Sequence, residues 1–166
     1  MKKKLDKTKT NFITSCAFLN VRFRRNFWQV ATEVWTHGGI ADVIAIDGNM
    51  VHEFEVKISC ADINKERKKR KHHDKSRMPN YFTLVIPHEK RIYKCAKKFV
   101  EEVNHKYGIT TISKDCIVRV KKGSQILHRN NSNSLDQLRK NTFQRATSEL
   151  ANIRKKLYKI KGFDKW

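Results

Sequence analysis

The chain has few acidic residues and no long apolar segment. Of its 166 residues, 16 are Asp or Glu and 37 are Lys or Arg, which gives a formal net charge of +21. An excess of this size on a chain long enough for one domain argues for a polyanionic partner, with nucleic acid first and an anionic membrane surface second. The absence of a long apolar segment and of a lipidation signal argues against the membrane.

Closely spaced cysteines are also missing. Cys16, Cys60, Cys95 and Cys116 lie far apart, without a Cys-x-x-Cys or Cys/His ligand spacing, so no zinc site is expected. The basic start of the chain continues into the polar residues 6–11 and not into the apolar segment of a secretory signal. These features predict free thiols in a reducing cytoplasm.

The hydrophobic pattern predicts an α/β fold with a central mixed sheet of about four to five strands, flanked by helices. The apolar run over residues 80–87 indicates a buried strand that is parallel to its neighbour. Strand patterns cover residues 28–36, 40–46, 51–58, 80–87, 109–112 and 116–120, and helical patterns follow Thr8 or Thr10 and cover residues 59–73 and 89–107.

Three segments lie outside the predicted core domain, which covers residues 10–123. Residues 1–9 are expected to be a flexible basic tail, and residues 124–134 a polar linker. Residues 135–166 contain a long basic amphipathic helix. The sequence leaves open whether this helix packs across the sheet, pairs with a second subunit or lies along a duplex.

One acidic residue, Asp42, interrupts the apolar strand 40–46. A hairpin between residues 40–46 and residues 51–58 can form in two registers, which differ in the residue that lies opposite Asp42. With a four-residue loop, Ile46 pairs with Val51 and Asp42 lies opposite Glu55; with a two-residue turn, Asp42 lies opposite Glu53.

Both registers put Asp42 on the face that carries Glu55 and Lys57, whereas a three-residue loop without a bulge would not. Two carboxylates and a lysine that converge in this way can hold a hard divalent cation and leave an ammonium group beside a reacting oxygen. Glu53 lies on the same face, and its role stays open.

Asp42, followed by Glu55-Val56-Lys57 on the next strand, resembles the signature of the PD-(D/E)XK nuclease superfamily. The proline that usually precedes the aspartate is replaced by Ala41. A helix and a strand precede the signature, and a helix and a strand follow it. This order resembles the superfamily core, and more loosely its small DNA-repair and resolvase-like members related to MmcB, which implies a restriction-endonuclease-like fold.

The resemblance implies metal-dependent cleavage of phosphodiester bonds in DNA. Asp42, Glu55 and the carbonyl of Val56 would bind Mg²⁺ or Mn²⁺, and Lys57 would position or deprotonate the attacking water or stabilise the charge of the transition state. Glu33, in the first strand, could add a catalytic carboxylate, or it could be an edge residue that pairs with a lysine.

A basic stretch follows the signature and is expected to lie exposed at the mouth of the site. Its side chains would contact the phosphate backbone without reading sequence. They are Lys65, Lys68, Lys69, Arg70 and Lys71. His72 and His73 point some 100° apart on a helix, so surface roles are expected for them. Arg22, Arg24 and Arg25, near the end of the first helix, either meet phosphate or form a solvated basic end.

We therefore expect a magnesium-dependent endonuclease that acts on DNA in repair, recombination or replication. A Holliday-junction resolvase is a narrower version of this hypothesis, and a homodimer would suit it. The alternative is a nuclease-fold protein that binds nucleic acid, or serves as an accessory subunit, without cutting. RNA stays open as a substrate.

Overall fold

The computed structural model describes residues 2–36, 38–74, 78–129 and 135–161, with side chains from Lys7 to Asn152 within these ranges. The helices and strands follow one another in the order of an α/β protein. They are α1 (Lys2–Leu19), the π-helical segment η1 (Asn20–Arg24), β1 (Gln29–Thr36), β2 (Gly39–Asp47), β3 (Met50–Val56), α2 (Cys60–Arg67), the 3-10 turn η2 (Arg70–His72), β4 (Tyr81–Pro87), α3 (Lys90–Val103), β5 (Gly108–Ile112), β6 (Val118–Lys122) and α4 (Leu135–Lys161).

The strands form one open sheet in the order β1-β2-β3-β4-β5-β6. The β3–β4 and β4–β5 pairs are parallel and the other three are antiparallel, so the sheet is mixed as predicted, and β4 is buried and parallel to both neighbours. The sheet has six strands where four to five were expected, because both edge strands, β1 and β6, hydrogen-bond to the inner strands.

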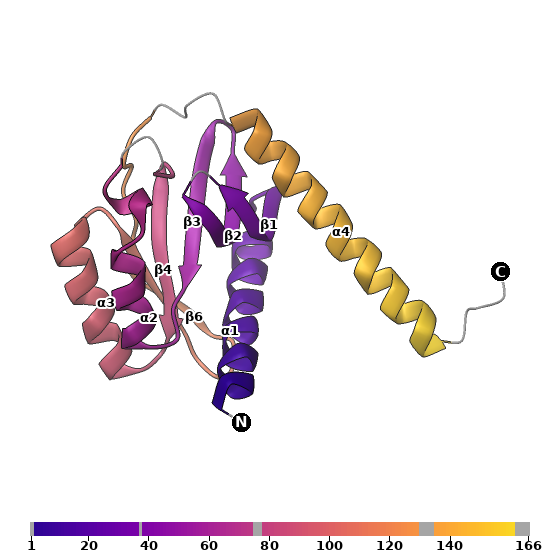
Figure 1. Cartoon of the computed structure of the whole chain (residues 1–166), viewed down its shortest axis with the longest axis horizontal. Coiled ribbons are helices and arrows are strands. Elements are labelled where there is room, and N and C mark those ends of the chain that lie inside the picture. Colours follow the sequence, from indigo (N-terminus) through magenta and orange to yellow (C-terminus); the bar gives the residue numbers. More distant parts are fainter. Residues whose placement is uncertain (1, 37, 75–77, 130–134, 162–166) are drawn as a thin grey trace.

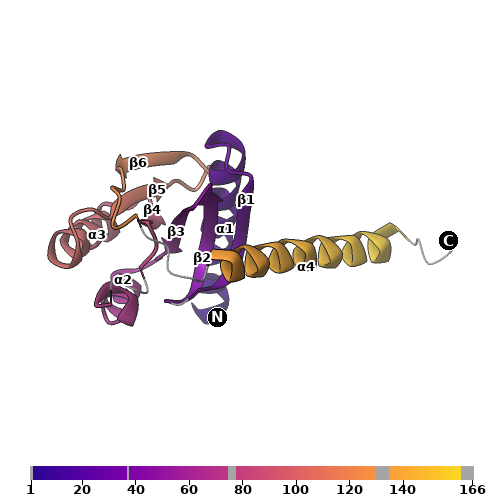
Figure 2. The same ribbon diagram turned by 90° about the horizontal axis from the view of Figure 1, so that it is seen from above.

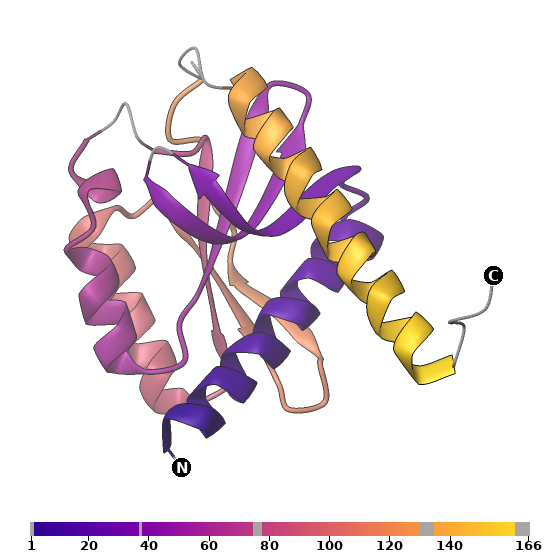
Figure 3. The same ribbon diagram turned by 45° about the vertical axis from the view of Figure 1, so that its right-hand side comes forward.

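Helices cover both faces of this sheet. Helix α1 runs diagonally across one face (Figure 3), where Ile13 and Ala17 pack on Val43, Phe54 and neighbouring residues. On the other face, α3 packs on β4 and β5 around Phe82 and Leu84, and α4 packs on β1 and β2. Strand β3 lies between these two packed areas (Figure 1).

Helix α4 packs on the sheet, which is the first of the three possibilities that the sequence left open. Leu138 closes a small apolar cluster with Ala31, Val34 and Ile44, and Arg139 donates a hydrogen bond to the carbonyl of Gly48. Seen from above in Figure 2, the helix continues well past the sheet. Among the described residues, no helix has the length and apolar character needed to cross a bilayer.

Two predicted boundaries were wrong. Helix α1 begins at Lys2, so residues 2–9 are helical where a tail was expected; no proline or glycine interrupts them, and Lys9 pairs with Glu89 at 2.7 Å. Gly108, expected just after a helix, opens β5. A Cβ there would lie 2.9 Å from Thr83 Oγ1, so the close approach of the strands requires glycine. Of the predicted linker, residues 130–134 lie outside the described part of the chain.

The prediction of free thiols is also wrong in the structure. Cys16 is bonded to Cys116 and Cys60 to Cys95, across sequence separations of 100 and 35 residues, and none of the four cysteines is free. The pairs could not be read from spacing, because the fold brings α1 against the β5–β6 turn and α2 against α3. Each disulfide ties two elements together at a Cα–Cα distance of 5.7 Å.

Candidate active site

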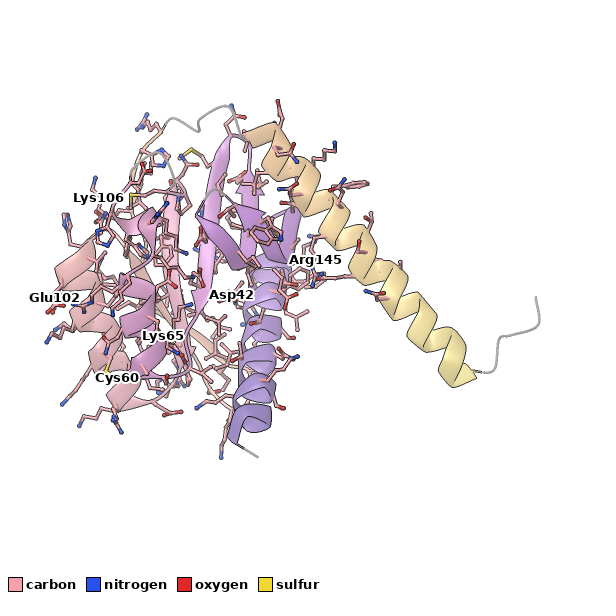
Figure 4. All side chains as sticks on the ribbon, in the orientation of Figure 1. Asp42, Cys60, Lys65, Glu102, Lys106 and Arg145 are labelled. Atoms are coloured by element: carbon pink, nitrogen blue, oxygen red, sulfur yellow. A yellow bond between two sulfur atoms is a disulfide. The ribbon has the colours of Figure 1, made fainter. Side chains whose placement is uncertain are left out.

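The β2–β3 hairpin adopts the first of the two predicted registers, but its turn is shorter than the four residues expected, because Asp47 pairs with Met50. Ile46 pairs with Val51 and Val43 with Phe54, so Asp42 lies opposite Glu55, as the first alternative predicted. The Oδ2 atom of Asp42 accepts a hydrogen bond of 2.7 Å from the backbone N–H of Val56. Asp42 therefore lies over β3, on the stretch of sheet between α2 and α4 (Figure 4).

Asp42 and Glu55 interact directly. The side chain of Asp42 is 29% exposed, and burial, together with the charge of Glu55 and a hydrogen bond to it, raises the pKa of Asp42 to about 7. Burial alone would also raise the pKa of Glu55, but the ammonium groups of Lys71 and Lys57 outweigh it and bring that pKa to about 2. Near neutral pH, Asp42 is therefore protonated in part of the molecules, and its proton then forms a hydrogen bond with the ionised Glu55.

Lys57 completes the predicted trio. Its Nζ atom lies 2.9 Å from Glu55 Oε2, 3.0 Å from Glu66 Oε2 and 4.0 Å from Asp42 Oδ2. Burial lowers the pKa of Lys57, but these carboxylates outweigh that effect and raise the pKa above its ordinary value. Lys57 therefore stays protonated in the free protein, which favours charge stabilisation over proton abstraction among its expected roles.

Two lysines that were expected to meet phosphate instead enclose the carboxylates. Lys71 is 2% exposed and pairs with Glu53, with Glu55 at 2.6 Å and with Glu66 at 3.0 Å. Lys69 lies 2.8 Å from Glu55 and 2.7 Å from Glu66. The prediction that Lys71 is exposed is wrong, because helix α2 ends at Arg67 and the η2 turn folds Lys71 back over β3.

The other three basic residues of that stretch lie on the surface, in accord with the sequence analysis. Lys65 projects from α2, Lys68 follows its end and Arg70 begins η2, and all three are exposed. They remain available for a phosphate backbone.

His72 is buried, which corrects its expected surface role, whereas His73 is exposed. The ring of His72 bridges the Tyr107 hydroxyl at 2.8 Å and Glu66 Oε1 at 3.0 Å. Its pKa is lowered by burial, so the neutral ring acts as a hydrogen-bonding link between α2 and Tyr107, the residue just before β5.

Glu33 is not brought into this cluster. Its side chain is 65% exposed, and its carboxylate lies 2.5 Å from the guanidinium of Arg145 on α4. The carboxylate that helps to raise the pKa of Asp42 is that of Glu55 and not that of Glu33. A positive φ of 51° at Glu33 interrupts the pairing between Thr32–Val43 and Val34–Ala41, so that Ala31 and Val34 both face α4. This local interruption of the strand pairing accounts for the orientation of Glu33.

Glu66 is the residue of the site that the sequence analysis did not identify. It is fully buried and contacts Lys57, Lys69, Lys71 and His72. Its position could have been predicted from its spacing in the sequence. Ser59 caps α2, and Glu66 follows the buried Ile63 by three residues, so the two side chains share the inward face of the helix. Glu66 holds the lysines that in turn hold Glu55.

The donor atoms suit a hard divalent cation. Asp42 and Glu55 offer carboxylate oxygens on adjacent strands, and a cation could replace the proton that they share. Among the described residues, however, no group of three or more acidic, histidine or cysteine side chains is arranged to hold a metal ion. Oxygens from water, from the Val56 carbonyl or from a substrate phosphate would have to complete the coordination.

Comparisons of the chain with protein-family models, with curated proteins and with solved structures find no match.

Proposed function

We propose that this protein is a metal-dependent endonuclease that hydrolyses phosphodiester bonds in DNA, in repair, recombination or replication. The observation that carries the proposal is the convergence of Asp42, Glu55 and Lys57, with Asp42 opposite Glu55 and the Lys57 ammonium within 4.0 Å of both carboxylates. A protein that only binds nucleic acid has no need for an acidic residue whose ionisation its own fold opposes.

The arrangement of elements supports the same proposal. Helix α1, the antiparallel strands β1, β2 and β3, helix α2 and the parallel strand β4 follow in the order that the resemblance to PD-(D/E)XK nucleases implies. A restriction-endonuclease-like core is therefore part of the proposal. The sixth strand and α4 extend that core on the two edges of the sheet.

In the proposed mechanism, Asp42, Glu55 and the Val56 carbonyl would hold Mg²⁺ or Mn²⁺. The bound ion would supply Lewis acidity at the scissile phosphate and a more acidic water. Lys57, kept protonated by its carboxylate neighbours, would stabilise the negative charge that grows on the phosphate. Lys71, together with Lys57, keeps Glu55 ionised, and Lys69 also pairs with it. The exposed Lys65, Lys68 and Arg70 would position the backbone.

One observation favours a second candidate, a nuclease-fold protein that binds nucleic acid without cutting it. Glu55 already has three lysine partners, Lys57, Lys69 and Lys71. If those ion pairs are stronger than the interaction with a cation, the site would stay closed to metal.

A cleavage panel separates the two candidates and identifies the substrate. Duplex, single-stranded, flap and four-way-junction DNA, with RNA of the same sequences, would be incubated with Mg²⁺, with Mn²⁺ and with EDTA. The nuclease proposal predicts products from at least one DNA with metal and none with EDTA. Binding without products under every condition would reject it in favour of the non-cutting protein.

A further inference from the structure

A second surface with the chemistry of a nucleic-acid site lies between α1 and β1. We name it the Arg22–Trp28 patch, after the residues of η1 and of the turn that follows. The π-helical geometry of η1 is uncommon and occurs often at functional sites. Asn26 takes a φ of 57° and the N–H of Phe27 bonds to the carbonyl of Val21, so the chain turns sharply while Val21 stays buried.

Two aromatic rings of this patch face solvent. Trp28 is 82% exposed and Phe23 is 65% exposed. The guanidinium of Arg22 lies 5.1 Å from the centre of the Trp28 ring and 5.4 Å from that of Phe23, and it donates to the Phe27 carbonyl. Arg22 thus holds both rings in place, which prepares their free surfaces for a flat partner.

The aromatic surface continues from the turn onto the sheet. The ring of Phe27 meets His52 edge-on with centroids 4.8 Å apart, and His52 stacks on Tyr81 at 4.2 Å with an angle of 11°. His52 alternates with Glu53 along β3, so it belongs to the α1 face of the sheet, opposite Asp42 and Glu55. The patch is therefore separate from the candidate active site.

The charge of the patch selects a polyanion. Among the described residues, no carboxylate lies in ion-pair contact with Arg22, Arg24 or Arg25, and Arg24 and Arg25 are exposed. The guanidinium of Arg22 is engaged by the two rings, whereas those of Arg24 and Arg25 can bind phosphate through two hydrogen bonds each, that of Arg25 from its place over Phe27 and Phe54. Exposed aromatic rings between them are of no use for phosphate alone, so the partner must also offer flat apolar groups.

We propose that the Arg22–Trp28 patch binds single-stranded nucleic acid. Unpaired bases would stack on Trp28 and Phe23, and Arg24 and Arg25 would contact the phosphates on either side. In a duplex the bases are stacked on one another and cannot reach the rings, so only the arginines would contribute. This inference does not depend on cleavage, because the patch lies on the other face of the sheet.

The test measures binding of the full-length protein to a fluorescent 20-nucleotide oligo(dT), and to a duplex of equal length, in EDTA. Trp28→Ala should weaken oligo(dT) binding roughly tenfold, since base stacking on one ring contributes on the order of 1–3 kcal/mol, and should change duplex binding less than twofold. Trp28→Phe should restore most of the affinity. Trp35→Ala is the matched control, because Trp35 is 67% exposed and no described arginine lies over its ring.

Two results would overturn the proposal. Equal losses for the Trp28 and Trp35 variants would show that the rings act without a specific site. Unchanged oligo(dT) binding by Trp28→Ala, with a loss of self-association in sedimentation, would identify the patch as a protein interface. Because binding is measured in EDTA, a failed cleavage assay leaves this test intact.

Discussion

Asp42 is the residue whose ionisation the fold opposes, and this has a measurable consequence. Its pKa rises from 3.8 to about 7 on folding, mainly through burial. Because the folded state binds this proton more tightly than the unfolded state, the free energy of unfolding falls as the pH rises from about 4 to above 7. A residue that weakens its own fold at neutral pH is typical of a functional site.

Asp42→Asn should therefore stabilise the protein at pH 8 and have little effect at pH 4. Asparagine can keep the bond from the Val56 N–H without the buried charge. Each tenfold change in proton affinity corresponds to ~1.4 kcal/mol, so we expect a gain of about 2–4 kcal/mol at pH 8 from urea unfolding. The exposed Asp115→Asn is the control. A gain of equal size at both pH values would contradict the assigned pKa.

Lys71 should matter for stability rather than for binding to phosphate. Lys71→Met leaves Glu53, Glu55 and Glu66 without their shared buried partner, and breaking such a buried pair typically destabilises by about 3–5 kcal/mol. Lys68→Met, at an exposed neighbouring position, should change the free energy of unfolding by less than about 0.5 kcal/mol. Equal urea midpoints for the two variants would reject the buried network.

At the scale of elements, the disulfides tie α1 to the β5–β6 turn and α2 to α3. A cross-link that closes a longer loop restricts the unfolded chain more. We therefore expect the double variant Cys16→Ala/Cys116→Ala to lose about 4–5 kcal/mol and Cys60→Ala/Cys95→Ala about 3–4 kcal/mol. Urea unfolding with and without reductant provides the measurement. If reductant leaves the wild-type midpoint unchanged, the cysteines are not paired in solution.

Helix α4 divides into a part that packs and a part that extends past the sheet. Among the side chains described, up to Asn152, its packing contacts come from the segment between Leu135 and Glu149, whereas Leu150 is largely exposed. A chain that ends after Glu149 should unfold at the same temperature as the full chain within a few degrees. A chain that ends at Arg129 should unfold earlier, because it exposes Ala31, Val34 and Ile44. The unfolding temperatures of the three chains can be measured by circular dichroism. Equal temperatures for all three would contradict the packing of α4 on the sheet.

The elements that could be predicted are those with a local signal. The face of the hairpin on which Asp42 lies followed from the parity of the apolar residues around it, although two registers stayed open, and β4 followed from its continuous apolar run. The burial of Lys71 depends on contacts between η2 and β3, and each disulfide joins elements that are far apart in the sequence, so no local period reveals them. The inward position of Glu66, in contrast, had a local signal in its spacing from Ile63. From sequence alone, a run of basic residues is predicted to lie exposed to solvent, because carboxylates that pair with it come from another element, here β3.

At the scale of the whole molecule, the two faces of the sheet carry different chemistry. One face holds the Asp42–Glu55–Lys57 cluster between α2 and α4, and the other holds the Arg22–Trp28 patch beyond the end of α1. A net charge of +21 draws a polyanion to both. The proposals together describe a protein that cuts one part of a DNA molecule and binds unpaired nucleotides at another.

Cleavage of a DNA substrate from the panel by wild type and by Asp42→Asn, side by side with Mg²⁺ or Mn²⁺, tests the central claim most directly. We predict that the variant loses at least a hundredfold in rate while it binds the same DNA equally well and unfolds no earlier. Glu55→Gln and Lys57→Met should behave alike in rate, and Glu33→Gln should keep its activity. Wild-type rates in the Asp42→Asn protein, or no cleavage by the wild type, would contradict the assignment of this cluster as a nuclease centre.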